Sequence, residues 1–156
     1  MMRRAGTLVL SLLALSAADR PAATKADEAA REKALIALLA DSTWESRWHA
    51  FSPEGFTKGG ENRYRIVRAQ KVKGDDWVIF GGFELEGKPV ELPLPAKIFW
   101  ADDTPVMSMT GLALPGEPAF DVRILFKGDM FSGVFQSQPL SGALVGVKVK
   151  KAKDAK

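Results

Sequence analysis

Cysteine is absent from this chain, and histidine and tyrosine occur once each among its 156 residues. The lack of cysteine excludes a disulfide framework, a lipoprotein attachment site and thiolate-ligated metals. With His49 as the single histidine, few side chains titrate near neutral pH. The sequence also lacks a Gly-x-Ser-x-Gly elbow, a phosphate-binding glycine loop and a dinucleotide fingerprint. We therefore expect no catalytic residue, no metal site, no cofactor and no enzymatic activity.

Long apolar runs are missing beyond residues 5–15, which follow Arg3 and Arg4. That run is too short to span a bilayer, and small residues come after it, as in a secretory signal peptide. We predict a signal peptide over residues 1–18, cleaved near Ala18, then a Pro/Ala linker over 19–25. The mature protein is then exported, to the periplasm or the exterior, and has no integral membrane segment. Without disulfides it depends on burial of a hydrophobic core.

Excess positive charge is confined to the two ends of the chain. The formal net charge is +3, of which the signal holds two arginines and residues 148–156 a net +4, leaving −3 on residues 19–147. A nucleic-acid-binding protein carries its positive charge on a folded face. We therefore expect no nucleic-acid partner, and residues 151–156 are interpreted as a basic, solvated tail.

A single helix is expected over residues 26–41. Thr24 and Asp27 form a capping-box pattern, which marks a helix N-terminus. The residues that follow place an apolar stripe at helical spacing, namely Ala30, Ala34, Leu35, Leu38 and Leu39. We expect this helix to pack across one end of a β-structure.

Between Trp44 and Lys150 short segments alternate apolar and polar residues, and each segment is closed by Gly, Pro, Asp or Asn. This period of two predicts about eight antiparallel strands in meander order, with Glu86-Gly87 as a two-residue hairpin turn. Eight is the number at which an up-and-down barrel closes around side chains or one small ligand. We predict one all-β barrel domain over residues 26–150. A two-sheet sandwich is the alternative, because Pro93 and Pro95 indicate a sheet edge.

The order helix, first-strand tryptophan, meander and basic last strand resembles the calycin group of lipocalins and fatty-acid-binding proteins. The resemblance implies a barrel with a basic residue across Trp44 from the last strand, a place that Lys148 can take. Ser42-Thr43-Trp44 stands where lipocalins have Gly-x-Trp, and the Thr-Asp-Tyr loop and Arg-x-Tyr anchor of the group are absent. Residues 100–106 and 131–135 also resemble segments of uncharacterised exported bacterial proteins, which implies no activity.

The side chains that are expected to face the barrel interior indicate a binding function. All four tryptophans fall on the apolar parity of their strands, where they either fill a core or line a cavity. We expect a small apolar or amphipathic ligand inside the barrel, with polar contacts near the ends, Lys148 among them. The expected ligand-binding residues are Trp44, Trp48, Tyr64, Trp77, Trp100 and Gln136. A monomer is expected.

A surface interaction module, which binds cell-wall polysaccharide or another exported protein, is the alternative function. It rests on apolar residues assigned to the outward parity: Phe51, Phe56, Val78, Phe80, Phe99, Leu125, Phe131 and Phe135. Hydrolytic chemistry would have to use carboxylates such as Glu45, Glu84 and Glu91. These lie opposite the tryptophans in parity, on the wet face, where acids make poor general acids.

Overall fold

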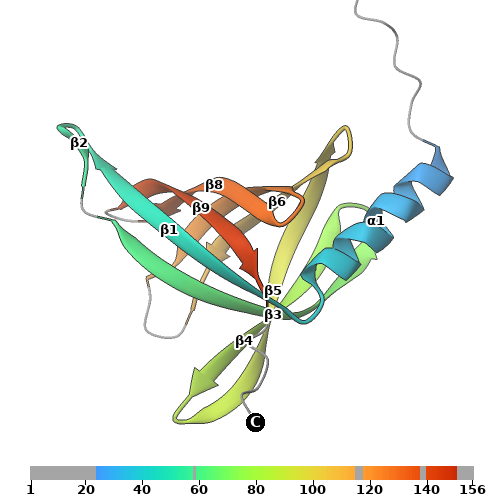
Figure 1. Ribbon diagram of the computed structural model, residues 1–156, viewed down its shortest axis with the longest axis horizontal. Coiled ribbons are helices and arrows are strands. Elements are labelled where there is room, and N and C mark those ends of the chain that lie inside the picture. Colours follow the sequence, from blue (N-terminus) through green and yellow to red (C-terminus); the bar gives the residue numbers. More distant parts are fainter. Residues whose placement is uncertain (1–23, 58, 115–117, 138–139, 151–156) are drawn as a thin grey trace, which may run out of the picture.

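The computed structural model describes residues 24–57, 59–114, 118–137 and 140–150. They form a closed antiparallel β-barrel of eight strands, with one further short strand and a preceding helix (Figure 1). The predicted all-β class is confirmed. The predicted signal peptide (1–18), residues 19–23 of the predicted linker and the predicted tail (151–156) lie outside the described residues.

Helix α1 (Lys25–Leu39) begins at the predicted capping box. The Thr24 hydroxyl accepts the backbone N–H of Asp27 at 3.2 Å, and the Asp27 carboxylate accepts the backbone N–H of Thr24 at 3.0 Å. Hydrogen bonds from the Thr24 side chain and backbone hold the pKa of Asp27 below its usual value. The helix ends before the predicted residue 41, and the chain turns at Asp41, whose φ is 47°.

The barrel strands run around the barrel in sequence order, each antiparallel to its neighbours. Their bounds are β1 (Ser42–Ser52), β3 (Gly60–Lys73), β4 (Asp76–Leu85), β5 (Lys88–Ala101), β6 (Thr104–Leu112), β7 (Phe120–Lys127), β8 (Met130–Ser137) and β9 (Ser141–Val149). The two-residue strand β2 (Gly55–Phe56) pairs with the end of β1. Glu86 and Gly87 form the predicted β4–β5 hairpin turn, with φ values of 53° and 74°.

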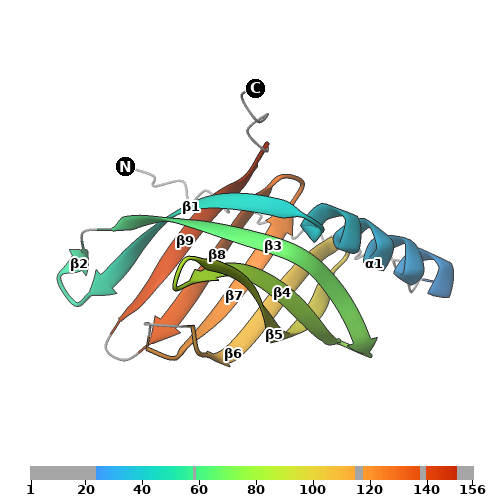
Figure 2. The same ribbon diagram turned by 90° about the horizontal axis from the view of Figure 1, so that it is seen from below.

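Closure of the sheet decides between the two predicted architectures. Strand β9 pairs with β1 in continuous register, from Thr43 opposite Val149 to Phe51 opposite Ser141. A single sheet that returns to its first strand is a barrel, so the sandwich alternative is wrong. Figure 2 shows α1 at one end of this barrel and β2 at the opposite end, which we call the helix end and the far end.

The core is densest near the helix end. Leu35 and Leu39 of α1 are 2% and 0% exposed, and Trp44 and Trp77 are 1% and 2% exposed. The indole ring of Trp44 packs edge-on against Phe126, with the ring centroids 5.5 Å apart. These contacts confirm that the helix packs across one end of the β-structure.

Gly146 shows why glycine recurs inside the strands. It pairs with Phe131 on the inward face of β8 and β9. A Cβ atom at Gly146 would overlap the Phe131 ring and lie 2.7 Å from the carbonyl oxygen of Glu45. The missing side chain therefore makes room for the aromatic ring and allows the sheet to curve.

The two prolines of β5 lie where that strand has one neighbour. Strand β5 pairs with β4 along its whole length, but with β6 only from Lys97 to Ala101. Pro93 and Pro95 fall in the half without a β6 partner, which confirms the sheet edge that these prolines predict. The barrel wall therefore has an unpaired edge between the first half of β5 and the last residues of β6.

The predicted orientation of β8 is wrong. Phe131 pairs with the buried Phe126, and Phe135 pairs with the buried Val122, so both rings face inward. The intervening residues of this strand face solvent, among them Gln136. The error arose because both parities of β8 carry apolar residues, so that the local alternation does not fix the inward face.

Candidate ligand-binding site at the far end of the barrel

At the helix end, two side chains of the barrel donate hydrogen bonds to the last turn of α1. Lys148 Nζ donates to the Leu38 carbonyl at 2.6 Å. The Ser42 hydroxyl donates to the Leu39 carbonyl at 2.6 Å and accepts the indole N–H of Trp44 at 2.9 Å. Because α1 has no basic residue in its own last turn, Lys148 supplies the cation that the helix dipole favours there. Lys148 also pairs directly with Trp44, the position that the calycin resemblance implied.

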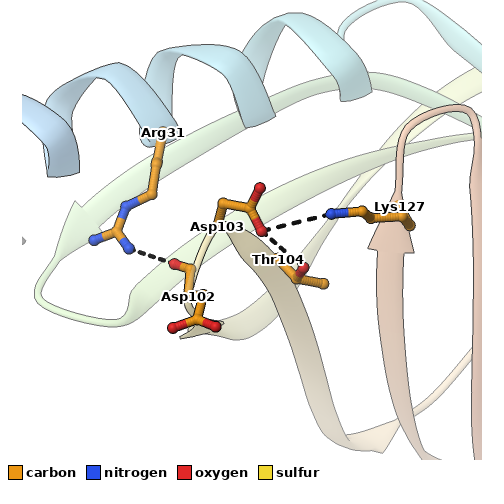
Figure 3. A network of polar contacts seen from close by, with 5 residues as sticks. All are labelled: Arg31, Asp102, Asp103, Thr104 and Lys127. Carbon is orange, nitrogen blue, oxygen red and sulfur yellow. Dashed lines mark hydrogen bonds and ion pairs between the residues drawn. The ribbon is translucent and has the colours of Figure 1, made fainter. Parts of the chain in front are cut away.

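A second set of contacts holds α1 against the β5–β6 turn (Figure 3). Arg31 donates to the Asp102 carbonyl at 2.5 Å, and its guanidinium lies 5.0 Å from the centroid of the Trp100 ring. Asp103 pairs with Lys127 at 3.5 Å, and that positive charge is the main reason for the lowered pKa of Asp103. A hollow of about 450 Å³ lies between this part of the barrel and the helix. Trp100 therefore serves the attachment of α1.

The far end differs, because its large inward aromatic side chains are incompletely buried. Trp48, Phe120 and Phe135 face inward there and are partly exposed, as is Phe83 two residues beyond the buried Gly81. The rings of Trp48 and Phe135 meet edge to face, with centroids 6.0 Å apart and an interplanar angle of 90°. Four partly exposed aromatic side chains thus face inward at this end, and we call this set the aromatic mouth. Phe83 pairs with Val90 in the half of β5 that has no β6 partner.

Polar groups lie just inside this aromatic mouth. Ser46 is 4% exposed on the inward face of β1, and its hydroxyl has no hydrogen-bond partner among the described residues. Asn62, which pairs with Ser46, donates through Nδ2 to the Tyr64 hydroxyl at 3.0 Å. A buried hydroxyl without a partner is uncommon in folded proteins and calls for a water or a ligand. The interior therefore offers a hydrogen-bonding position beneath an apolar mouth.

The structure divides the six predicted ligand-binding residues. Trp48 lies at the far end, while Trp44 and Trp77 are enclosed in the packed core. Tyr64 pairs with Trp44 and is partly exposed, so it lies deeper than the far end. Trp100 lies under Arg31 at the helix end. The inward orientation expected for Gln136 is wrong: it pairs with Asp121 and Ser141 on the outer face and is exposed.

Sequence reasoning missed Ser46 and three aromatic residues of the mouth. Alternation puts Ser46, Phe83 and Phe120 on the same parity as the apolar residues of their strands, but that pattern carries no information about depth along the barrel. Phe135 was assigned to the wrong face. A Phe-Ser-Gly-Val-Phe pattern with glycine between two aromatic residues is the signal that points to an inward Phe131 and Phe135.

The titratable residues considered for catalysis lie on the outer face. Glu45 pairs with Arg63 at 3.4 Å, and Glu91 pairs with Arg68 at 3.8 Å. Glu84 and His49 are exposed. Within the described ranges, no three His, Cys, Asp or Glu side chains are grouped so that they could hold a metal ion.

A larger hollow lies outside the barrel. It is an open groove of about 810 Å³ across the outer faces of β3, β1, β9, β8 and β7. Apolar side chains form much of its floor, among them Leu125, Met130, Val145 and Val147. The apolar side chains of its floor have the opposite parity to the aromatic residues of the mouth, although the inward residues Ser46 and Asn62 also border the groove.

Comparison with protein-family models, with curated proteins and with solved structures finds no match to this chain. The fold itself, an eight-stranded closed antiparallel barrel preceded by one helix, is compatible with the calycin architecture. Among the described residues, no helix has the length and apolar character needed to cross a bilayer.

Proposed function

We propose that this chain is an exported, non-enzymatic binding protein that takes a small apolar or amphipathic ligand at the far end of its barrel. The observation that carries the proposal is the unequal burial of the inward side chains. Trp44 and Trp77 are almost completely buried, whereas Trp48, Phe120 and Phe135 are partly exposed although they face inward. Inward aromatic side chains that are incompletely covered provide an apolar surface that a ligand can bury.

The unpartnered hydroxyl of Ser46 defines the polar part of the ligand. A group that donates or accepts a hydrogen bond, such as an alcohol, carbonyl or carboxylic acid, would satisfy the Ser46 hydroxyl. The side chains that we assign to the mouth itself are all aromatic. An aliphatic chain with one polar end therefore matches this arrangement better than a polar metabolite with many hydrogen-bonding groups.

Isothermal titration calorimetry of the mature protein with dodecanol and lauric acid tests the proposal. We expect saturable binding of at least one probe, weakened about five- to thirtyfold by Phe120→Ala, because an aromatic contact of this kind contributes about 1–2 kcal/mol. Phe99→Ala is the matched control, since Phe99 lies on the outer face and is 45% exposed. The Phe99→Ala variant should bind each probe with the same Kd as the unmodified protein.

Native mass spectrometry of protein purified from its own export compartment gives an independent result. We expect a fraction that carries a small apolar adduct. Protein that is always free of adduct, and that binds neither probe in calorimetry, would contradict the proposed function.

Absence of turnover belongs to the same proposal. Glu45 and Glu91 form ion pairs on the wet face, where acids make poor general acids. We expect no hydrolysis of a panel of esters or polysaccharides. Activity that disappears in Glu45→Gln, Glu84→Gln or Glu91→Gln would refute this and would move the site to the outer face.

The alternative of a polysaccharide-binding surface has less support. Sugar-binding platforms need exposed aromatic rings that lie side by side. The exposed pair Phe51 and Phe56 is 44% and 78% exposed, but the rings meet at 74° rather than in one plane. All four tryptophans face the inside of the barrel, by their pairing with other inward residues.

A further inference from the structure

The outer wall of the barrel carries an exposed apolar face that the proposed ligand site does not use. Its side chains are between 39% and 58% exposed and come from β5, β7, β8 and β9: Phe99, Leu125, Met130, Val134, Val145 and Val147. The strand register connects them. Phe99 pairs with Val106, which pairs with Leu125 on the next strand. Leu125 in turn pairs with Ser132, which pairs with Val145. We call this set the apolar face, and the groove of about 810 Å³ runs across it.

Charges of alternating sign line one side of the groove. Glu45 lies opposite Arg63, and Arg47 lies opposite Glu61, on the neighbouring strands β1 and β3. The Arg47–Glu61 ion pair is 2.9 Å long, and the Arg63–Glu45 pair is 3.4 Å long. All four side chains are more than half exposed. We call these four residues the charged rim; its net charge is zero.

This pattern of charge is complementary to itself. A two-fold axis that runs across the strands, between the levels of Glu45 and Arg47, places Glu45 of one copy across from Arg47 of the other and Arg63 across from Glu61. The same axis places Val145 across from Val147, because these valines pair with Arg47 and Glu45, so that opposite charges and the apolar faces meet in one arrangement. A strongly acidic or basic partner would instead find as many repulsive as attractive charges on the rim.

The closed barrel restricts how two copies can associate. Edge-to-edge pairing needs an unpaired strand, and the unpaired half of β5 contains Pro93 and Pro95, which lack the N–H donors of a ladder. Contact through the outer face needs no free backbone groups. Contiguous apolar surface of this kind on a soluble protein marks an interaction site.

We propose that the apolar face and the charged rim form the interface of a homodimer, in which each copy covers the groove of the other. This departs from the monomer expected from the sequence. It is independent of the ligand site, because the apolar face and the aromatic mouth lie on opposite sides of the barrel wall.

Sedimentation velocity of the mature protein over a hundredfold range of concentration tests the dimer. We expect a concentration-dependent monomer–dimer equilibrium whose dissociation constant rises at least tenfold in Val145→Glu, where a carboxylate replaces a side chain on the groove floor. Val72→Glu is the matched control, because Val72 is an equally exposed valine (61% against 57%) that does not line the groove. Circular dichroism shows whether each variant is folded.

The charged rim provides a second, reciprocal test. Arg47→Glu should weaken the dimer, since it leaves three acids on each rim. Exchanging all four signs, by Glu45→Arg, Arg47→Glu, Glu61→Arg and Arg63→Glu together, restores the alternation and should recover the native dissociation constant.

A monomer at all concentrations overturns the proposal, as does a dimer that is equally stable in Val145→Glu and Val72→Glu. Binding of the monomer to phosphatidylcholine vesicles through Val145 would assign the apolar face to a lipid surface and would also overturn it.

Discussion

Replacing Ser46 with alanine should change stability and ligand affinity in opposite directions. The buried Ser46 hydroxyl has no hydrogen-bond partner among the described residues, and a buried group whose hydrogen bond is not made costs about 1–3 kcal/mol. Alanine removes the hydroxyl and little else from the barrel interior. We expect Ser46→Ala to raise the free energy of unfolding by about 1 kcal/mol, which corresponds to a rise in Tm of about 3–5 °C for a domain of this size.

Ligand affinity should fall in Ser46→Ala, because we propose that the Ser46 hydroxyl forms a hydrogen bond with the polar end of the ligand. Loss of one neutral hydrogen bond contributes about 0.5–1.5 kcal/mol, so the Kd for dodecanol should rise about two- to tenfold. Urea unfolding followed by tryptophan emission gives the stability, and calorimetry gives the Kd. Ser132→Ala on the exposed face of β8 is the control and should change neither. A Ser46→Ala variant that is less stable and binds dodecanol normally would refute the reasoning.

Three further predictions concern the frame that holds the site. Lys148→Met removes the cation at the end of α1 and should lower the free energy of unfolding by about 1–2 kcal/mol in urea, whereas Lys150→Met should have no effect. Gly146→Ala should lose about 1–3 kcal/mol by overpacking, and the second substitution Phe131→Leu should recover part of that loss in the same assay. A hydrogen bond from Lys97 holds the pKa of Asp76 below its ordinary 3.8. The native protein should therefore be more stable than Asp76→Asn above that pH, and the difference should disappear as the pH falls further. Urea unfolding at several pH values measures this difference.

Local signals in the sequence were sufficient for much of the frame. The capping box at Thr24 and Asp27 located the start of α1, and Glu86-Gly87 located a hairpin whose two residues both have positive φ. Pro93 identified the half-strand without a second neighbour. Each of these features depends on residues close in sequence, so its physical cause is visible in a short window.

Features set by long-range pairing were harder to predict. The inward face of β8 depends on the pairing of Phe131 with Phe126 and on the space left by Gly146, neither of which is local. Similarly, alternation placed Trp44 and Trp48 on the same face but did not reveal that one is 1% exposed and the other lies at the aromatic mouth. Depth along a barrel is set by strand tilt and by the position of α1, so the ligand-binding residues could be predicted only in part.

Contact quenching of tryptophan by dibromostearic acid tests the central claim most directly. Bromine quenches an indole only at short range, and Trp48 is the one tryptophan that the structure places at the aromatic mouth. We expect saturable quenching in the unmodified mature protein and loss of most of its amplitude in Trp48→Phe, with binding retained in calorimetry. Absence of quenching at saturating dibromostearic acid, or quenching of the same amplitude in Trp48→Phe, would contradict a ligand site at the far end of the barrel.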